Sequence, residues 1–101
     1  MIARDELGVE ICARCGRRGL RLTKDHFIPR ACGMNVDEAG NIVGLCERCN
    51  KDKGCMIVTP NWYRFLKEEQ KKPLLRYMRY AKSWILANTD EEEVVQMVKK
   101  L

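Results

Sequence analysis

Four of the six cysteines in this chain form two Cys-x-x-Cys pairs, a spacing typical of metal sites. The pairs are Cys12–Cys15 and Cys46–Cys49, with thirty residues between them. Two intervening residues let a tight turn aim both sulfurs at one point, and two such turns complete the tetrahedron of thiolates that zinc prefers. The sequence therefore predicts one structural Zn2+ with these four ligands and no open position for substrate.

The remaining cysteines, Cys32 and Cys55, are interpreted as buried small hydrophobic residues, with extra metal ligands or a disulfide as the alternatives. The N-terminal stretch MIARDELGVE has acidic residues where an export signal would be apolar. No apolar run exceeds four residues, so no membrane-spanning segment is expected. We therefore expect a cytoplasmic protein whose cysteines serve as metal thiolates.

A second group of chemically able residues surrounds the only histidine, His26. Asp25 precedes it, and Asn41 and Asn50 follow later in the chain. Asp25 and Asn50 offer oxygen atoms, which suit a hard cation such as Mg2+ or Mn2+. A partly neutral imidazole can accept a proton at pH 7. Because neighbouring residues of a strand point to opposite sides, Asp25 and His26 reach one site only if the chain bends there.

The elements that must position these residues are two strands and a short helix. Alternating apolar and polar residues over 20–25 predict one strand, and residues 41–45 predict another. An irregular loop over 29–40 separates them. The following CERCNKDKG predicts a short helix from Cys46 that Gly54 ends.

The second half of the chain, after Thr59, contains no glycine or cysteine and is predicted to be helical. Thr59 and Pro60 would begin a first helix, and Pro73 would begin a second. Thr89 and Glu92 would form a capping box for a third. Trp62, Phe65 and Trp84 are predicted to lie in the core, with base stacking as the alternative.

Three segments together resemble the HNH (ββα-metal) endonuclease family. They are the first cysteine pair, TKDHFIP at 23–29 and NIVGLCERCNKDKG at 41–54. The resemblance covers about residues 10–55 and implies an α+β fold with a ββα-metal core, a four-cysteine structural zinc site and about three further helices. One domain is expected over 1–101, with the core at 8–56 and a helical extension at 59–101. In place of the Gly-Gly pair that many members have after the proline, this chain has ACGMN at 31–35.

The resemblance also implies a role for each residue around the histidine. His26 would be the general base that activates a water, and Asn41 would tether the loop that aims it. Asp25 and Asn50 would hold one catalytic divalent cation, Mg2+ or Mn2+. The products would carry 5′-phosphate and 3′-hydroxyl ends.

The charge of the chain favours a partner that carries phosphates. Nineteen Lys and Arg against fourteen Asp and Glu give a net charge of +5. The residues expected to bind nucleic acid are Arg14, Arg17, Arg18, Arg21, Lys24, Arg30, Lys51 and Lys53, with a merely solvated basic face as the alternative. A second basic stripe, Lys72, Arg76 and Arg79 beside Tyr80, is interpreted as a solvated helix face, with nucleic-acid binding as the alternative.

These features predict a metal-dependent HNH endonuclease that hydrolyses DNA phosphodiester bonds, nicking one strand or, as a dimer, cutting both. The first alternative is a non-catalytic zinc module that binds nucleic acid. The second is an interaction subunit whose helices dock on a larger phage-packaging or restriction complex.

Overall fold

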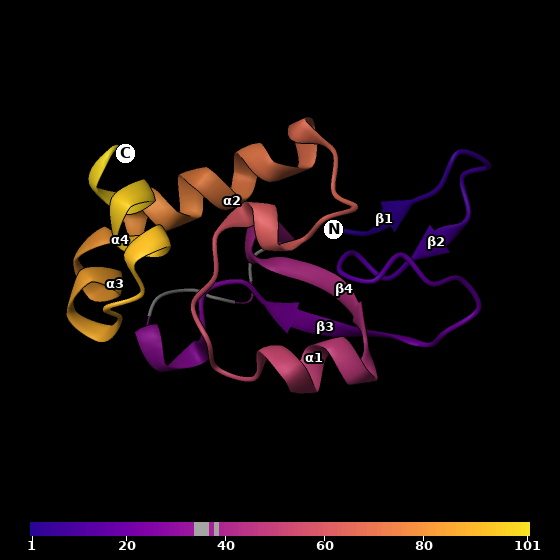
Figure 1. Cartoon of the computed structure of the whole chain (residues 1–101), viewed down its shortest axis with the longest axis horizontal. Helices are drawn as coiled ribbons and strands as arrows, with labels where there is room; N and C mark the ends of the chain where they lie inside the picture. Colours follow the sequence, from indigo (N-terminus) through magenta and orange to yellow (C-terminus); the bar gives the residue numbers. More distant parts are fainter. Residues whose placement is uncertain (34–36, 38) are drawn as a thin grey trace.

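The computed structural model describes residues 1–33, 37 and 39–101, and it measures 39 × 24 × 24 Å along its principal axes. The last two helices lie together at the end far from the N-terminal strands, and the helix before them runs from above the central strands toward that end (Figure 1). The segment ACGMN at 31–35, which replaces the Gly-Gly pair of many HNH sequences, lies partly outside the described residues. The architecture is α+β, as expected from the sequence.

The centre of the molecule is an antiparallel hairpin covered by one helix. Strand β3 (Leu22–His26) pairs with β4 (Ile42–Cys46) in a regular ladder from Leu22↔Cys46 to His26↔Ile42. Helix α1 (Glu47–Lys53) follows β4 at once and packs on both strands. Gly54 ends it with φ +53° and donates its N–H to the Asn50 carbonyl. The predicted order of strand, loop, strand and helix is confirmed, with bounds shifted by one or two residues.

A second small sheet near the N-terminus was not predicted. Strand β1 (Ala3–Arg4) pairs with β2 (Glu10–Ile11), and each strand has only two residues, too few for an alternation to be recognised. The Met1 carbonyl accepts the N–H of Gly44 in β4 at 2.9 Å. A side chain at Gly44 would meet Ile2 at 2.6 Å, so this glycine lets the N-terminal segment approach β4.

The first part of the helical extension differs from the prediction. Thr59 and Pro60 begin only a single 3-10 turn, η3 (Pro60–Trp62), rather than an α-helix. Helix α2 (Glu68–Tyr80) begins five residues before Pro73, which lies inside it. The start is fixed by Gln70, whose side-chain oxygen accepts the Lys67 N–H at 3.0 Å. The prediction that a helix starts at Pro73 is therefore wrong.

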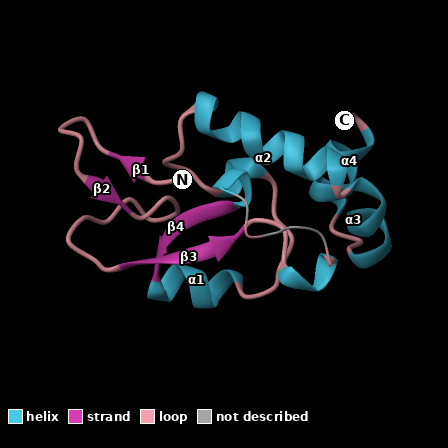
Figure 2. Ribbon diagram, turned by 180° about the vertical axis from the view of Figure 1, so that it is seen from behind, coloured by secondary structure: helices cyan, strands magenta, loops and turns pink. Residues whose placement is uncertain are grey.

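The remaining helices are α3 (Lys82–Asn88) and α4 (Glu92–Lys99). Ala81, with φ −89° and ψ 7°, separates α3 from α2, so one predicted helix is two. The predicted capping box is also wrong, because Thr89 Oγ1 accepts the Glu91 N–H at 3.2 Å and Glu91 is the residue that precedes α4. Figure 2 shows α3 and α4 packed together beyond the end of α2.

A cluster of buried residues among those described extends from Ala3 to Val98, so the hairpin and the C-terminal helices share a core. Trp62 and Trp84 pack partly buried against this cluster. Phe65, predicted to be buried, is 44% exposed. Cys32 is partly buried, whereas Cys55 is exposed, so the prediction of a buried Cys55 is wrong. No helix in the described part of the chain is both long and apolar enough to cross a bilayer.

Phe65 covers the turn that follows the first cysteine pair. Gly16 has φ +74°, and a Cβ built on it would lie 2.5 Å from the Phe65 ring. Gly19 has nearly the same φ, +76°, but a Cβ there would meet nothing within 4 Å. A comparison of the two glycines therefore distinguishes the cost of the left-handed backbone, which both positions share, from the cost of the contact with Phe65, which only Gly16 has.

Gly16→Ala is expected to lower the melting temperature more than Gly19→Ala. Both substitutions force alanine into the left-handed region at a cost of about 1–2 kcal/mol, but only Gly16→Ala also displaces the Phe65 ring. Thermal unfolding of the zinc-loaded variants measures the difference. Equal losses would show that the Phe65 contact contributes no stability.

Candidate metal centre and catalytic face

The two Cys-x-x-Cys pairs meet at one point. The sulfurs of Cys12, Cys15, Cys46 and Cys49 all lie within 4.8 Å of one another. The Cys15 and Cys46 sulfurs are 3.9 Å apart, which matches the separation of about 3.8 Å that Zn–S bonds of about 2.3 Å give in a tetrahedron. The donor set and its spacing therefore fit a structural zinc ion.

Local backbone structure aims these sulfurs. In the first pair, the Gly16 N–H donates to the Cys12 carbonyl at 2.9 Å and closes the turn. In the second pair, Cys46 ends β4 and Cys49 lies in the first turn of α1. Burial alone would raise the pKa of Cys12, but backbone N–H groups that donate to its sulfur lower it to about 7. Cys12 thus favours the thiolate, the form that binds metal, whereas burial raises the pKa of Cys15 and of Cys49.

Asp25 lies inside the molecule, 2% exposed, on the side of β3 that faces α1. Its Oδ1 is 3.2 Å from the ammonium of Lys53, whose side chain is fully buried. Its Oδ2 accepts a hydrogen bond from the Tyr63 hydroxyl. Burial and the Asp25 charge both raise the pKa of Tyr63, so the phenol stays protonated and remains a donor. The buried carboxylate thus has a cation on one oxygen and a hydrogen-bond donor on the other.

Asn41 is fully buried and holds the chain just beyond β3. Its Oδ1 accepts the Ile28 N–H at 2.7 Å, and its Nδ2 donates to the Ile28 carbonyl at 3.0 Å. The Asn41 carbonyl accepts the N–H of Phe27 at 2.8 Å. These bonds fix the two residues that follow His26, which is the geometry expected of a loop tether.

His26 takes different partners from Asp25. Its Nε2 lies 2.9 Å from Asp37 Oδ1, and its side chain is 17% exposed. The His26 hydrogen bond lowers the pKa of Asp37, and the charges of Arg30 and Lys24 contribute to that shift. The ladder stays regular through His26, so the bend expected between Asp25 and His26 is absent and the chain turns after the histidine. Among the described residues, no hydrogen bond or ion pair joins the His26 ring to Asp25.

Asn50 lies on α1 beside the first half of β3. Its Nδ2 donates to Thr23 Oγ1 at 2.7 Å and approaches the Lys24 carbonyl at 3.4 Å. Thr23 and Asp25 are two residues apart and therefore share a face of β3. Asp25 and Asn50 thus offer a carboxylate and an amide on the same side of the strand. The two residue types suit a hard divalent cation, but both Asp25 oxygens are already engaged in this structure, one by the Lys53 ammonium and the other by the Tyr63 hydroxyl.

The residues predicted to bind nucleic acid occupy several environments. The prediction that Lys53 binds nucleic acid is wrong. Its buried ammonium pairs with Asp25 and donates to the His26 carbonyl at 3.0 Å, where no phosphate can reach it. Three others pair with surface carboxylates, as Arg18 with Asp5, Arg30 with Asp37 and Lys51 with Glu47. Arg14 is half-buried, and the exposed members without an ion-pair partner in the described part of the chain are Arg17, Arg21 and Lys24.

The sequence did not predict the residues that contact Asp25 and His26, which are Tyr63 and Asp37. Tyr63 lies in the extension, which gave no sign of contact with the hairpin. Asp37 lies in an irregular loop, where no periodicity predicts its position. A signal for Lys53 did exist, since it follows Asn50 by three positions on the same helix and therefore points to the same side.

Lys53→Met is expected to destabilise the fold by about 3–5 kcal/mol, because it leaves a buried carboxylate without its cation. Tyr63→Phe should cost about 1–3 kcal/mol through the lost hydrogen bond. Urea unfolding of the zinc-loaded variants measures both losses.

Lys51→Met is the matched control, because it removes an exposed lysine from the same helix and should cost less than about 1 kcal/mol. The double variant Asp25→Asn/Lys53→Met should recover much of the loss, since neither charge remains. A Lys53→Met variant as stable as Lys51→Met would contradict the buried ion pair.

The purified chain is expected to contain one zinc ion, and removing it should unfold the protein because the binding free energy is folding free energy. Cys46→Ser should lose both the metal and the cooperative transition. Cys55→Ser, which changes an exposed cysteine outside the cluster, should keep both. Native mass spectrometry and circular dichroism report the two properties, and a folded Cys46→Ser variant without metal would contradict the structural role.

Comparison with known families agrees with this geometry. Residues 12–55 match the family model described as HNH endonuclease, a family of nucleic-acid-cleaving enzymes. No curated protein and no solved structure matches the chain. The matched segment contains the four cysteines, the β3–β4 hairpin and α1, whereas Tyr63 lies beyond it. The cysteine cluster, the β3–β4 hairpin and α1 are therefore similar to an HNH endonuclease core, over residues that make up less than half of the chain.

Proposed function

We propose that this chain is a metal-dependent endonuclease that hydrolyses DNA phosphodiester bonds, with His26 as its general base. The observation that carries the proposal is the pairing of a partly exposed His26 with Asp37 at 2.9 Å, next to residues held by Asn41. A histidine serving only the core would not need an exposed carboxylate partner. One such site suits a nick in one strand, and two copies of the chain would cut both.

The His26–Asp37 pair suggests which nitrogen acts as the base. An ionised carboxylate only accepts hydrogen bonds, so Nε2 carries the hydrogen and the lone pair lies on Nδ1. Nδ1 would take the proton of a water as that water attacks the phosphorus. Asp37 would then stabilise the imidazolium that forms.

Asp25 and Asn50 are the residues that would hold the divalent cation, Mg2+ or Mn2+. When bound, such a cation offsets negative charge on the phosphate and on the leaving oxygen. Two protein oxygens and a neighbouring ammonium make a weak site, so we expect the cation to bind together with the nucleic acid. Lys24 and Arg30 border the His26 side of β3 and would contact phosphates there.

His26→Ala is expected to lower the rate of plasmid nicking by about 10²- to 10⁴-fold, the usual contribution of a general base. Supercoiled DNA, with Mg2+, with Mn2+ or with neither, shows the nick as conversion to the relaxed form. The His26→Ala variant must have the zinc content and the circular dichroism spectrum of the wild type. Asn88→Ala, an exposed change on α3, is the control that should nick normally.

Two outcomes would favour the alternatives instead. If neither folded protein nicks DNA in any metal but both retard it on a gel, the chain is a zinc-containing nucleic-acid-binding module. If neither nicks nor binds, an interaction subunit of a larger phage or restriction complex becomes the better hypothesis. Nicking that survives His26→Ala would contradict the assigned base.

A further inference from the structure

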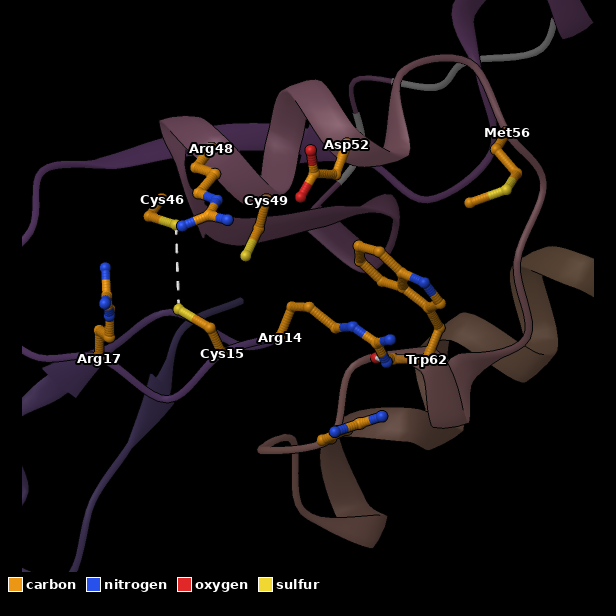
Figure 3. A pocket seen from close by; sticks show the side chains of 10 residues that line it. Arg14, Cys15, Arg17, Cys46, Arg48, Cys49, Asp52, Met56 and Trp62 are labelled. Carbon is orange, nitrogen blue, oxygen red and sulfur yellow. Dashed lines mark hydrogen bonds between the residues drawn. The ribbon is translucent and has the colours of Figure 1, made fainter.

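A hollow of about 490 Å³ lies beside the four cysteines, between α1 and the segment around η3 (Figure 3). Four arginines line it, coming from the first cysteine turn, from α1 and from the residues after η3; they are Arg14, Arg17, Arg48 and Arg64. Asp52 is the one acidic residue in the described lining. We call this region the arginine cleft.

Three of these arginines have no partner among the described residues. Arg17, Arg48 and Arg64 are exposed, and no hydrogen bond or ion pair engages their side chains in the part of the chain that the structure describes. Several other surface cations pair with carboxylates, as Arg4 does with Glu10 at 3.3 Å. The cleft therefore gathers guanidinium groups whose donors remain available, and guanidinium donors match phosphate oxygens in geometry.

The fourth arginine is held in place. Arg14 Nη1 donates to the Trp62 carbonyl at 2.6 Å, and its guanidinium lies 4.6 Å from the centre of the Trp62 ring. Figure 3 shows the two side chains side by side at the centre of the cleft. A charge fixed in advance loses less side-chain entropy when it binds an anion.

The arginine cleft lies on a different side of α1 from Asn50 and Lys53, the residues near Asp25. Arg48 and Asp52 are four positions apart and share one side of the helix, while Asn50 and Lys53 share another. A second hollow of about 340 Å³ shares Arg14, Trp62 and Arg64 and extends toward α4. The two hollows together form a path across Trp62, away from His26.

We propose that the arginine cleft binds the backbone phosphates of the nucleic acid at a distance from the bond that is cut. The inference rests on the proposed function, since it concerns the same nucleic-acid substrate. The competing explanation is that the arginines only neutralise the cysteine site, whose zinc-bound thiolates carry a formal charge of −2. The four arginines carry more positive charge than the zinc–thiolate group and Asp52 together carry negative charge. Three of the four guanidiniums are also exposed to solvent.

Binding of a fluorescein-labelled 20-base-pair DNA duplex, followed by fluorescence anisotropy without Mg2+ or Mn2+, tests the cleft. The double variant Arg48→Gln/Arg64→Gln should bind at least about 10-fold more weakly. The slope of log affinity against log salt should fall by about two, one for each lost phosphate contact. The matched control, Arg76→Gln/Arg79→Gln, removes the same charge from exposed positions of α2 and should change both quantities less.

A second measurement follows the cleft directly. In a Trp84→Phe background Trp62 is the only tryptophan, so its emission should change when unlabelled duplex is added. Equal weakening by both double variants would overturn the proposal, because it would reveal a general effect of charge. Loss of zinc with unchanged DNA affinity in the Arg48/Arg64 variant would also overturn it, in favour of charge neutralisation.

The result can be separated from that of the nuclease proposal. If the wild-type protein binds DNA through Arg48 and Arg64 but cuts nothing, the result supports the proposed cleft and contradicts the proposed nuclease activity. If the wild-type protein nicks DNA and the Arg48/Arg64 variant binds DNA as tightly as it does, the result contradicts the proposed cleft and supports the nuclease activity.

Discussion

A carboxylate taken out of water must be compensated inside the protein, and the structure depends on how Asp25 is compensated. Lys53 reaches it from α1, and Tyr63 reaches it from the segment after the hairpin. Because removal of either partner leaves a buried group unsatisfied, strand, helix and extension are fixed relative to one another. The extension is therefore joined to β3 and α1 through the contact of Tyr63 with Asp25, although the family match ends at residue 55.

The hairpin separates this polar centre from the cysteine cluster. Its ladder begins at Leu22↔Cys46, next to the cysteines, and ends at His26↔Ile42, next to the Asn41 tether. Four residue steps at about 3.4 Å place the two ends roughly 14 Å apart. Different contacts hold the two ends. The cysteine cluster lies at the Leu22↔Cys46 end, and the hydrogen bonds between Asn41 and Ile28 lie at the His26↔Ile42 end. The register of the hairpin is thus held at both ends, while Val43 and Leu45 pack in the core between them.

The parts of this structure that sequence could predict are those encoded by local spacing. The two cysteine pairs and the ββα order needed only turn geometry and alternation, and both are found. The helix starts were harder to predict, because Gln70 rather than Pro73 fixes the start of α2, and Ala81 divides what was predicted as one helix into two. Burial of Lys53 and its pairing with Asp25 depend on long-range packing. Its spacing from Asn50 indicates which side of α1 Lys53 occupies, but not that its ammonium is buried against Asp25.

The contrast between Lys53 and the arginines of the cleft follows from their chemistry. A compact ammonium on a flexible stem can be buried against one carboxylate and one carbonyl, as Lys53 is. A guanidinium has five donors in a plane, so one carboxylate and one carbonyl would leave several of them unsatisfied, whereas its planar fork matches phosphate oxygens at a surface. Helix α1 carries both kinds of cation within six residues, Arg48 toward the cleft and Lys53 toward β3. A single turn-and-a-half of helix thereby separates the charge that stabilises the fold from the charge that is available to a polyanion.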